Sequence, residues 1–284
     1  MAEGQILQSR ERAPRQDDAA PARAPLWRRW GVPVAGVAVF FVAWQLIAVA
    51  YEGTSLTASA SRVPLPLAIA KTLVDMRGGF GSTLGTTVQG ALLGLLAGTV
   101  IAVAVSVITV SMRWLEDTVY PYLIASQMVP TIVLAPIVFA VVKNGTVARV
   151  IVAAYVSFFV IVVNMTKGLK SVGPDQLSLL RSIRARRWQY YTKLRLWACL
   201  PFFFAGLKVA APLSVVGEIV VERTGAHLGL GQLMINSLNY GGSQLYVFWG
   251  AVVLTAALGY ALYLLATVLE RKLTPWQHEF RSRA

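Results

Sequence analysis

Six long apolar segments alternate with polar stretches along this chain, and they limit what it can fold into. They lie near residues 32–51, 84–110, 119–142, 147–165, 200–221 and 246–269. Each approaches or exceeds the ~20 residues that an α-helix needs to cross a hydrocarbon layer of ~30 Å. The segments are too long and too uniformly apolar for barrel strands, and a helix satisfies its own backbone hydrogen bonds in hydrocarbon. The sequence therefore predicts an all-α, polytopic membrane protein with about six transmembrane helices.

The composition agrees with a membrane protein and disfavours several other classes. Hydrophobic residues make up 56% of the chain and charged residues only 14%, with a mean hydropathy of +0.60. A soluble domain carries about a quarter charged residues. The net charge of +13 comes mainly from basic residues between the apolar segments, which the positive-inside rule explains better than nucleic-acid binding does. The single cysteine, Cys199, excludes an intrachain disulfide and a multi-cysteine metal site. We expect membrane lipid, and no nucleic acid, among the partners.

The distribution of lysine and arginine sets the orientation that we expect. With the N-terminus inside, the outer segments hold only Arg62, Lys71, Arg77, Lys143, Arg149 and Arg223. Both termini are then cytoplasmic, in a multi-pass protein of the plasma (inner) membrane. Residues 1–26 have no apolar run and are predicted to be a disordered cytoplasmic tail. Residues 27–277 form the transmembrane domain, and residues 278–284 form a cytoplasmic C-terminal tail.

Prolines, glycines and one lysine add detail to the spans. The third span is predicted to be kinked or locally opened, because it contains Pro121, Pro130 and Pro136. Glycines recur every four residues in the second span, at Gly90, Gly94 and Gly98. Such a ladder of small residues favours close helix packing. Lys208, in the fifth span, is expected to extend its side chain to the inner interface.

A basic segment at about residues 167–196 separates the fourth and fifth spans. It belongs in the cytoplasm, because each arginine or lysine at bilayer depth costs ~2.5 kcal/mol or more. Gly173, Pro174 and Asp175 are typical of the start of a new helix. That short helix would carry an apolar stripe of Leu177, Leu180, Ile183 and Trp188 beside a basic stripe of Arg181, Arg184 and Arg187. Three partners fit such stripes: the anionic inner leaflet, the rest of this protein, or a separate cytoplasmic protein.

Two carboxylates in the fifth span are the main intramembrane candidates. Glu218 and Glu222 lie four residues apart, on one helix face. Ionisable groups in a membrane helix are costly and often functional, so they are predicted to line a translocation pathway or gate. They alternatively pair with Arg223 or Arg149 at the outer interface. Pro212 is predicted to kink the same helix and give the gate compliance. No histidine or cysteine accompanies the carboxylates for catalysis, so we do not expect an enzyme.

Several motifs together resemble one family. They are residues 182–189, 193–196, 200–201 and 205–210 around the fifth span, residues 62–66 before the second, Glu222 with residues 229–231, and residues 269–276. Taken together, these runs resemble the permeases of binding-protein-dependent ABC importers, of the nitrate/sulfonate/taurine-type branch. The resemblance covers about residues 30–276. It implies a type I ABC importer permease-like fold.

The resemblance also implies partners and a site. The basic segment would be the loop that couples to an ABC ATPase, through Leu177, Leu180, Arg181, Ile183, Arg184, Ala185 and Trp188. An extracytoplasmic solute-binding protein and a second permease subunit, identical or related, would complete the assembly. The chain has no Walker motif, so ATP and Mg would be bound by the partner ATPase and no cofactor by this chain.

The chain departs from the family's coupling signature. The Glu-Ala-Ala of that signature falls on Ser178, Leu179 and Leu180, its glycine on Arg184, and its closing Leu-Pro on residues 196–197. Only the leucine is retained. Either the partner permease carries a standard loop, or the groove of the ATPase has diverged with this one.

The sequence thus predicts the transmembrane subunit of an ABC importer that moves a small solute into the cytoplasm, powered by ATP hydrolysis in a partner. The alternative is a stand-alone ion-coupled secondary transporter or channel. The lack of an evident inverted repeat in the sequence argues against this alternative. The substrate is left open between a sulfonate, nitrate, taurine and a vitamin precursor.

Overall fold

The structure, a computed structural model, describes residues 26–54, 64–225, 228–242 and 244–276, and these residues form helices joined by short connections. The helices in chain order are α1 (Leu26–Thr54), α2 (Pro66–Asp75), α3 (Arg77–Ser111), α4 (Arg113–Ser126), α5 (Thr131–Val142), α6 (Gly145–Lys170), α7 (Pro174–Ser182), α8 (Arg187–Tyr190), the π-helical turn η2 (Tyr191–Arg195), α9 (Leu196–Thr224), α10 (Leu230–Tyr240) and α11 (Gln244–Leu273). The predicted all-α class is confirmed. The predicted tails, residues 1–26 and 278–284, lie outside the described residues except for Leu26.

Long apolar helices match the predicted spans. Within the described residues, four are long and apolar enough to cross a membrane: α3, α6, the continuous helix Trp188–Thr224 and α11. These correspond to the second, fourth, fifth and sixth predicted spans. The first predicted span lies in α1, which holds a shorter apolar stretch, Val34–Ala50. A multi-pass membrane protein follows from length and composition.

The third predicted span is broken in two. The axes of α4 and α5 make a bend of 97° at the connection between them. Taken together, the two helices count as a fifth candidate span. Pro130 lies at this break, with extended backbone, directly before the first residue of α5. Pro121 and Pro136 lie inside α4 and α5, which continue through them. The predicted local opening is therefore confirmed, and Pro130 marks its place as the residue that precedes α5.

The centre of the bundle is built from α3, α6 and α9, which pack against one another through small residues. A side-chain carbon at Gly98 of α3 would lie 2.6 Å from the carbonyl oxygen of Ala154 in α6. On α9, a side-chain carbon at Gly217 would lie 3.0 Å from the Cα of Ala153. Gly94 of α3 would likewise meet Ala153. The predicted glycine ladder is confirmed as a close-packing surface.

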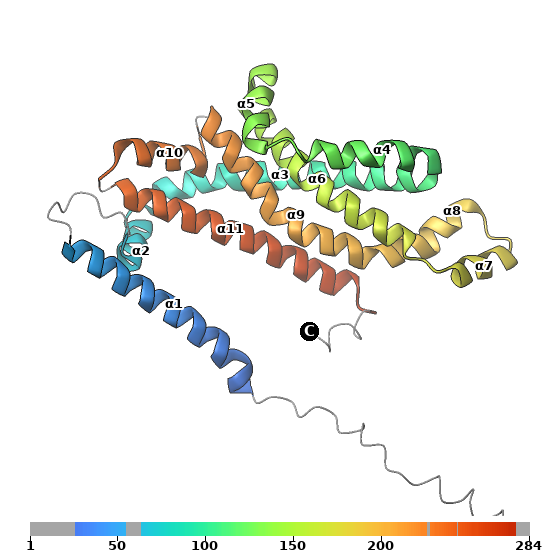
Figure 1. The fold of residues 1–284 in the computed structure, drawn as a ribbon, viewed down its shortest axis with the longest axis horizontal. Coiled ribbons are helices and arrows are strands. Elements are labelled where there is room, and N and C mark those ends of the chain that lie inside the picture. The colour runs from blue at the N-terminus through green and yellow to red at the C-terminus, as the bar shows by residue number, and fades with distance from the viewer. Residues whose placement is uncertain (1–25, 55–63, 226–227, 243, 277–284) are drawn as a thin grey trace, which may run out of the picture.

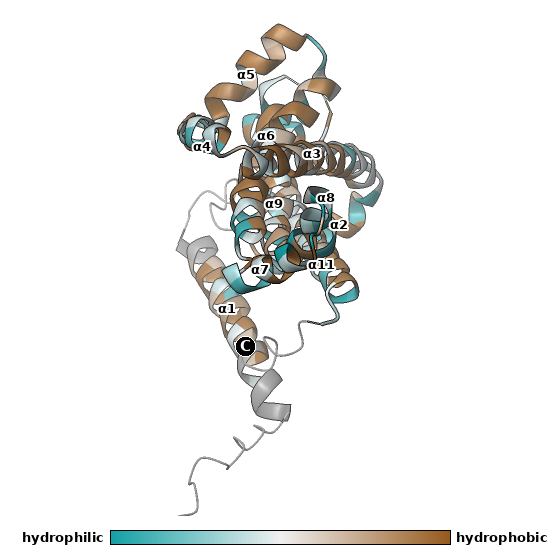
Figure 2. Ribbon diagram, turned by 90° about the vertical axis from the view of Figure 1, so that its right-hand side faces the viewer, coloured by the Kyte–Doolittle hydropathy of each residue, from teal (hydrophilic) through white to brown (hydrophobic). Residues whose placement is uncertain are grey.

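The two ends of the bundle differ in character. Helices α7 and α8 project from one end, and α2 and α10 lie at the opposite end (Figure 1). Helix α1 diverges from the bundle; its Trp44 meets Trp249 of α11, with ring centroids 6.3 Å apart. The long helices are mostly apolar along their length, whereas α7 carries more hydrophilic residues (Figure 2). The fold thus separates a polar projecting end from an apolar bundle.

Candidate functional site

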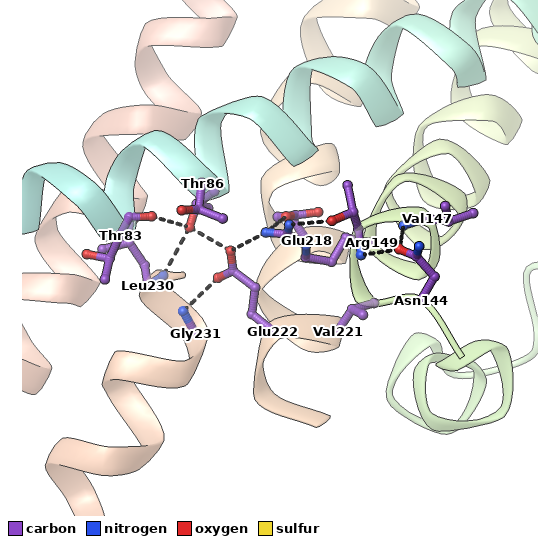
Figure 3. A network of polar contacts seen from close by, with 12 residues as sticks. Thr83, Thr86, Asn144, Val147, Arg149, Glu218, Val221, Glu222, Leu230 and Gly231 are labelled. Atoms are coloured by element: carbon purple, nitrogen blue, oxygen red, sulfur yellow. Dashed lines mark hydrogen bonds and ion pairs between the residues drawn. The ribbon is translucent and has the colours of Figure 1, made fainter. Parts of the chain in front are cut away.

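Three ionisable side chains from α6 and α9 meet inside the bundle. Glu218 and Glu222 of α9 are fully buried, and Arg149 of α6 is nearly so. The Arg149 Nη1 atom lies 3.3 Å from Glu218 Oε1 and 3.7 Å from Glu222 Oε1. Figure 3 shows the guanidinium lying between the two helices, with both carboxylates on its α9 side. An isolated buried charge is costly, so each of these side chains depends on the others.

Arg149, which the sequence analysis counted among the basic residues of the outer segments, lies inside α6. Helix α6 begins at Gly145, because the side chain of Asn144 caps it by accepting hydrogen bonds from the backbone N–H groups of Thr146 and Val147. The early start brings Arg149 into the second turn, facing α9. The alternative of a carboxylate–Arg149 pair is therefore confirmed, and the alternative of Arg223 is wrong because that side chain is exposed.

Glu222 also holds the N-terminus of α10. Its Oε2 accepts a hydrogen bond from the backbone N–H of Gly231 at 2.8 Å, and its Oε1 accepts one from the hydroxyl of Thr87 at 2.7 Å. The Thr87 oxygen in turn accepts from the backbone N–H of Leu230 at 3.0 Å. These two N–H groups are the first of α10, where a helix has no internal acceptors and a partial positive charge. Glu222 therefore ties α3, α9 and α10 together as an anion at a helix N-terminus (Figure 3).

Glycines make room for the two carboxylates. A side-chain carbon at Gly229 or Gly231 would collide with Glu222, and one at Gly90 of α3 would collide with Glu218. Gly229 has a φ of 121°, a backbone conformation that favours glycine. The pair Gly229 and Gly231 thus forms a turn fitted to Glu222.

A pathway or gate role for Glu218, Glu222 and Pro212 stays a prediction. Both carboxylates point into the interior of this chain, toward Arg149. Pro212 is half-buried and lies inside α9, which continues past it. Its Cβ faces Gly259 of α11, where an added side-chain carbon would lie 3.5 Å away.

The basic segment projects from the other end of the molecule and exposes apolar side chains. No residue of α7 is buried. The exposed fractions are 66% for Leu179, 67% for Ile183 and 58% for Trp188. Of the remaining predicted coupling residues, Arg181 and Arg184 are exposed, and Leu177, Leu180 and Ala185 are half-buried. Packing on the rest of this chain, one of the three alternatives, therefore leaves every residue of α7 at least partly exposed.

The single striped helix predicted for this segment is wrong as well. Helix α7 ends at Ser182, and α8 begins only at Arg187. Trp188 therefore belongs to a different helix from Leu177 and Leu180, and the apolar stripe does not continue across the turn. Its members instead lie on two short helices at the projecting end.

Arg184 explains where α7 ends. The N–H of Ala185 donates to the carbonyl of Leu180 at 3.0 Å, and the N–H of Arg184 donates to the carbonyl of Arg181 at 2.9 Å. These two bonds form a Schellman motif, which needs a left-handed residue, usually glycine, at the position of Arg184. Arg184 has a φ of 51°. The left-handed conformation costs a residue with a Cβ about 1–2 kcal/mol. This cost explains why the family signature has a glycine at the position aligned with Arg184.

A π-helical turn joins the basic segment to α9. The N–H of Leu196 donates to the carbonyl of Tyr191, five residues back. Arg195 stacks over the Tyr191 ring at 5.0 Å and donates to its hydroxyl oxygen at 3.1 Å. Such turns are rare and often lie at functional positions. Sequence analysis missed it, because no residue pattern marks a π-turn.

Two further ion pairs link helices that are distant in sequence. The Nζ of Lys208 in α9 lies 3.1 Å from an oxygen of Glu270 in α11, so the lysine has a partner within the bundle as well as partial exposure. Lys170 at the end of α6 pairs with Glu116 of α4. Within the described ranges, no three His, Cys, Asp or Glu side chains gather as a metal site would require.

The fold and these sites define a multi-span helical membrane protein with a projecting polar end and a buried charged cluster. The model of one family, "Binding-protein-dependent transport system inner membrane component", matches residues 90–275. The chain belongs to this family. The match runs from the middle of α3 to the end of α11 and includes the basic segment.

Relatives named for their transport functions agree with this assignment. The chain is 31% identical to the formylaminopyrimidine transport permease protein ThiX of Halalkalibacterium halodurans, over 76% of this chain and 86% of ThiX. It is 30% identical to the riboflavin transport system permease protein RibX of Chloroflexus aurantiacus, over 58% of this chain and 61% of RibX. It is 23% identical to the putative aliphatic sulfonates transport permease protein SsuC of Bacillus subtilis, over 86% of each chain.

A solved structure shares the fold. A chain of the MetNI methionine ABC transporter, in inward-facing conformations, matches with a TM-score of 0.59 at 19% identity. The match covers 70% of this chain and 98% of that one. The predicted ABC importer permease-like fold is confirmed.

Proposed function

We propose that this chain, as the transmembrane subunit of an ABC importer, couples solute passage to ATP hydrolysis in a partner through its basic segment. The observation that carries the proposal is the exposure of Leu179, Ile183 and Trp188 beside arginines at one end of the bundle. A separate protein with an apolar, acidic groove would bury these side chains. The ATPase would bind ATP and Mg, and this chain would hold no cofactor.

The remaining partners are proposed from the two other faces of the molecule. A solute-binding protein would dock at the end that carries α2 and α10, opposite the basic segment (Figure 1). A second permease subunit, identical or related, would pack against the apolar bundle and the diverging α1, and lipid would cover the rest. This arrangement puts the basic segment and both termini in the cytoplasm, in agreement with the positive-inside rule.

The solute is proposed to be a small nitrogen heterocycle. The two relatives reported above at 30% identity or more are named for riboflavin and formylaminopyrimidine, both nitrogen heterocycles. Sulfonates and nitrate, after which more distant relatives are named, are the competing solutes. Uptake of a labelled pyrimidine by cells with and without the gene separates these classes.

Co-purification tests the coupling role. A tagged chain extracted from its native membrane is expected to retain an ABC ATPase in stoichiometric amount. Ile183→Glu and Arg184→Glu should each release that ATPase, because they place a carboxylate at the proposed contact. Arg271→Glu, an exposed charge reversal at the end of α11, is the matched control and should retain it. Equal retention in all variants overturns the proposed site, and uptake driven by an ion gradient without any ATPase supports the stand-alone transporter.

A further inference from the structure

The buried charges at the α6–α9 contact do not balance. Glu218 and Glu222 supply two carboxylates, and Arg149 supplies one guanidinium. Among the described residues, no other basic side chain forms an ion pair with either carboxylate. With both carboxylates ionised, the cluster would carry a net negative charge in the interior, where an uncompensated charge is strongly unfavourable.

The two carboxylates have unequal support. Glu222 accepts hydrogen bonds from Thr87 and Gly231 and lies at the N-terminus of α10. These donors and the partial positive charge of the helix end favour an ionised group. Glu222 is therefore the anion of the cluster, balanced by Arg149.

Glu218 lacks this support. Neither of its oxygens has a hydrogen-bond partner among the described residues, and its 3.3 Å contact with Arg149 lacks hydrogen-bond geometry. The same Nη1 atom of Arg149 also faces Glu222, so the guanidinium is shared. On its other side the carboxyl lies against Gly90, which offers no side chain.

Other titratable groups on the surrounding elements do not supply the missing charge. On α6, Tyr155 donates to the carbonyl of Ser126, Lys167 is exposed, and Lys170 pairs with Glu116. Helix α3 carries Arg77 only, at its exposed N-terminus, and α10 carries only Tyr240, which is exposed at its far end. Lys143, which follows α5, and Arg223, on α9 itself, are both exposed. Helix α11 presents Tyr246 at this end of the bundle and Glu270 at the other, where Glu270 pairs with Lys208.

We infer that Glu218 is a proton-binding site, at which one carboxyl oxygen takes up a proton when α3, α6 and α9 are packed as in this structure. The neutral acid leaves one guanidinium and one carboxylate, which balance. Binding forms one O–H bond and changes no other bond. As the pH rises and the proton leaves, repulsion between Glu218 and Glu222 acts against this packing, so the packing is pH-dependent. The inference concerns this chain alone and does not require the proposed ATPase.

Infrared spectroscopy of the full-length chain in lipid nanodiscs tests the site. A protonated carboxyl has a C=O stretching band that is distinct from that of a carboxylate and shifts in heavy water. We expect such a band at neutral pH, its disappearance as the pH rises, and its absence in Glu218→Gln. Glu270→Gln is the matched control, because Glu270 is paired one to one with Lys208, and it should leave the band unchanged.

The wild-type protein keeps the inference testable even if Glu218→Gln fails to fold, because a protonated carboxyl at neutral pH is expected only at a buried acidic side chain, and in the described ranges these are Glu218 and Glu222. Absence of the protonated-carboxyl band in the wild type at neutral pH overturns the inference, and so does its persistence in folded Glu218→Gln. A second readout is the unfolding midpoint, which should fall with rising pH in the wild type and much less in Glu218→Gln.

Discussion

Replacement of Gly98 by alanine tests the packing at the centre of the bundle. The added Cβ would lie 2.6 Å from the carbonyl oxygen of Ala154 and 3.1 Å from its Cα. Both atoms belong to the backbone of α6, so no side-chain rotation relieves the contact, and α3 and α6 have to separate. Overpacking of this kind costs about 1–3 kcal/mol. Alanine stabilises a helix relative to glycine, and this gain offsets up to about 1 kcal/mol of that cost.

Gly85→Ala, in the same helix, is the matched control. A Cβ at Gly85 meets nothing within 4 Å, so only the helix-propensity gain of about 0.5–1 kcal/mol remains. We expect Gly98→Ala to be less stable than Gly85→Ala by about 1–3 kcal/mol, measured by reversible unfolding of the purified chain in lipid nanodiscs. Equal stability of the two variants, or a more stable Gly98→Ala, would refute the argument that α3 and α6 touch through their backbones.

Further substitutions test the charged cluster, the turn and the π-helix. Arg149→Met should destabilise the chain by about 3–5 kcal/mol in unfolding measurements, because it leaves the buried Glu222 carboxylate without its cation. Arg184→Gly should relieve up to about 1–2 kcal/mol of left-handed strain, seen as slower hydrogen exchange of α7 amides; faster exchange contradicts it. Deletion of Thr192 should convert the π-turn to α-helix and turn α8 by about 100° about the axis of α9. The chain should then still insert into the membrane and unfold as the wild type does, but it should no longer bind the ATPase.

Hydropathy alone located the long helices, because desolvation of a ~20-residue apolar segment outweighs local preferences. The glycine ladder was also predictable, since Gly90, Gly94 and Gly98 recur at a helical period. The prolines of the third span predicted a break, yet only Pro130 marks it. Inside α4 and α5, the helix continues through the other two prolines.

Contacts distant in sequence were harder to predict. The count of basic residues assigned Arg149 to the outer segments, whereas the structure buries it inside α6. The Lys208–Glu270 pair joins residues 62 positions apart, and no local pattern connects them. The turn at Arg184 lacks the glycine that normally marks such a helix end, so one helix was predicted where the structure has two. Glu222 was recognisable, but its role at the N-terminus of α10 depends on the tertiary packing of α3, α9 and α10.

Site-specific photocrosslinking in the native membrane tests the central claim most directly. A photoreactive residue at Ile183, on the basic segment, is expected to capture the ATPase subunit. The same residue at Tyr240, which is 82% exposed at the end of α10, should capture an extracytoplasmic binding protein and no ATPase. Capture of the ATPase from position 240, or from neither position in cells that contain the subunit, would contradict the account.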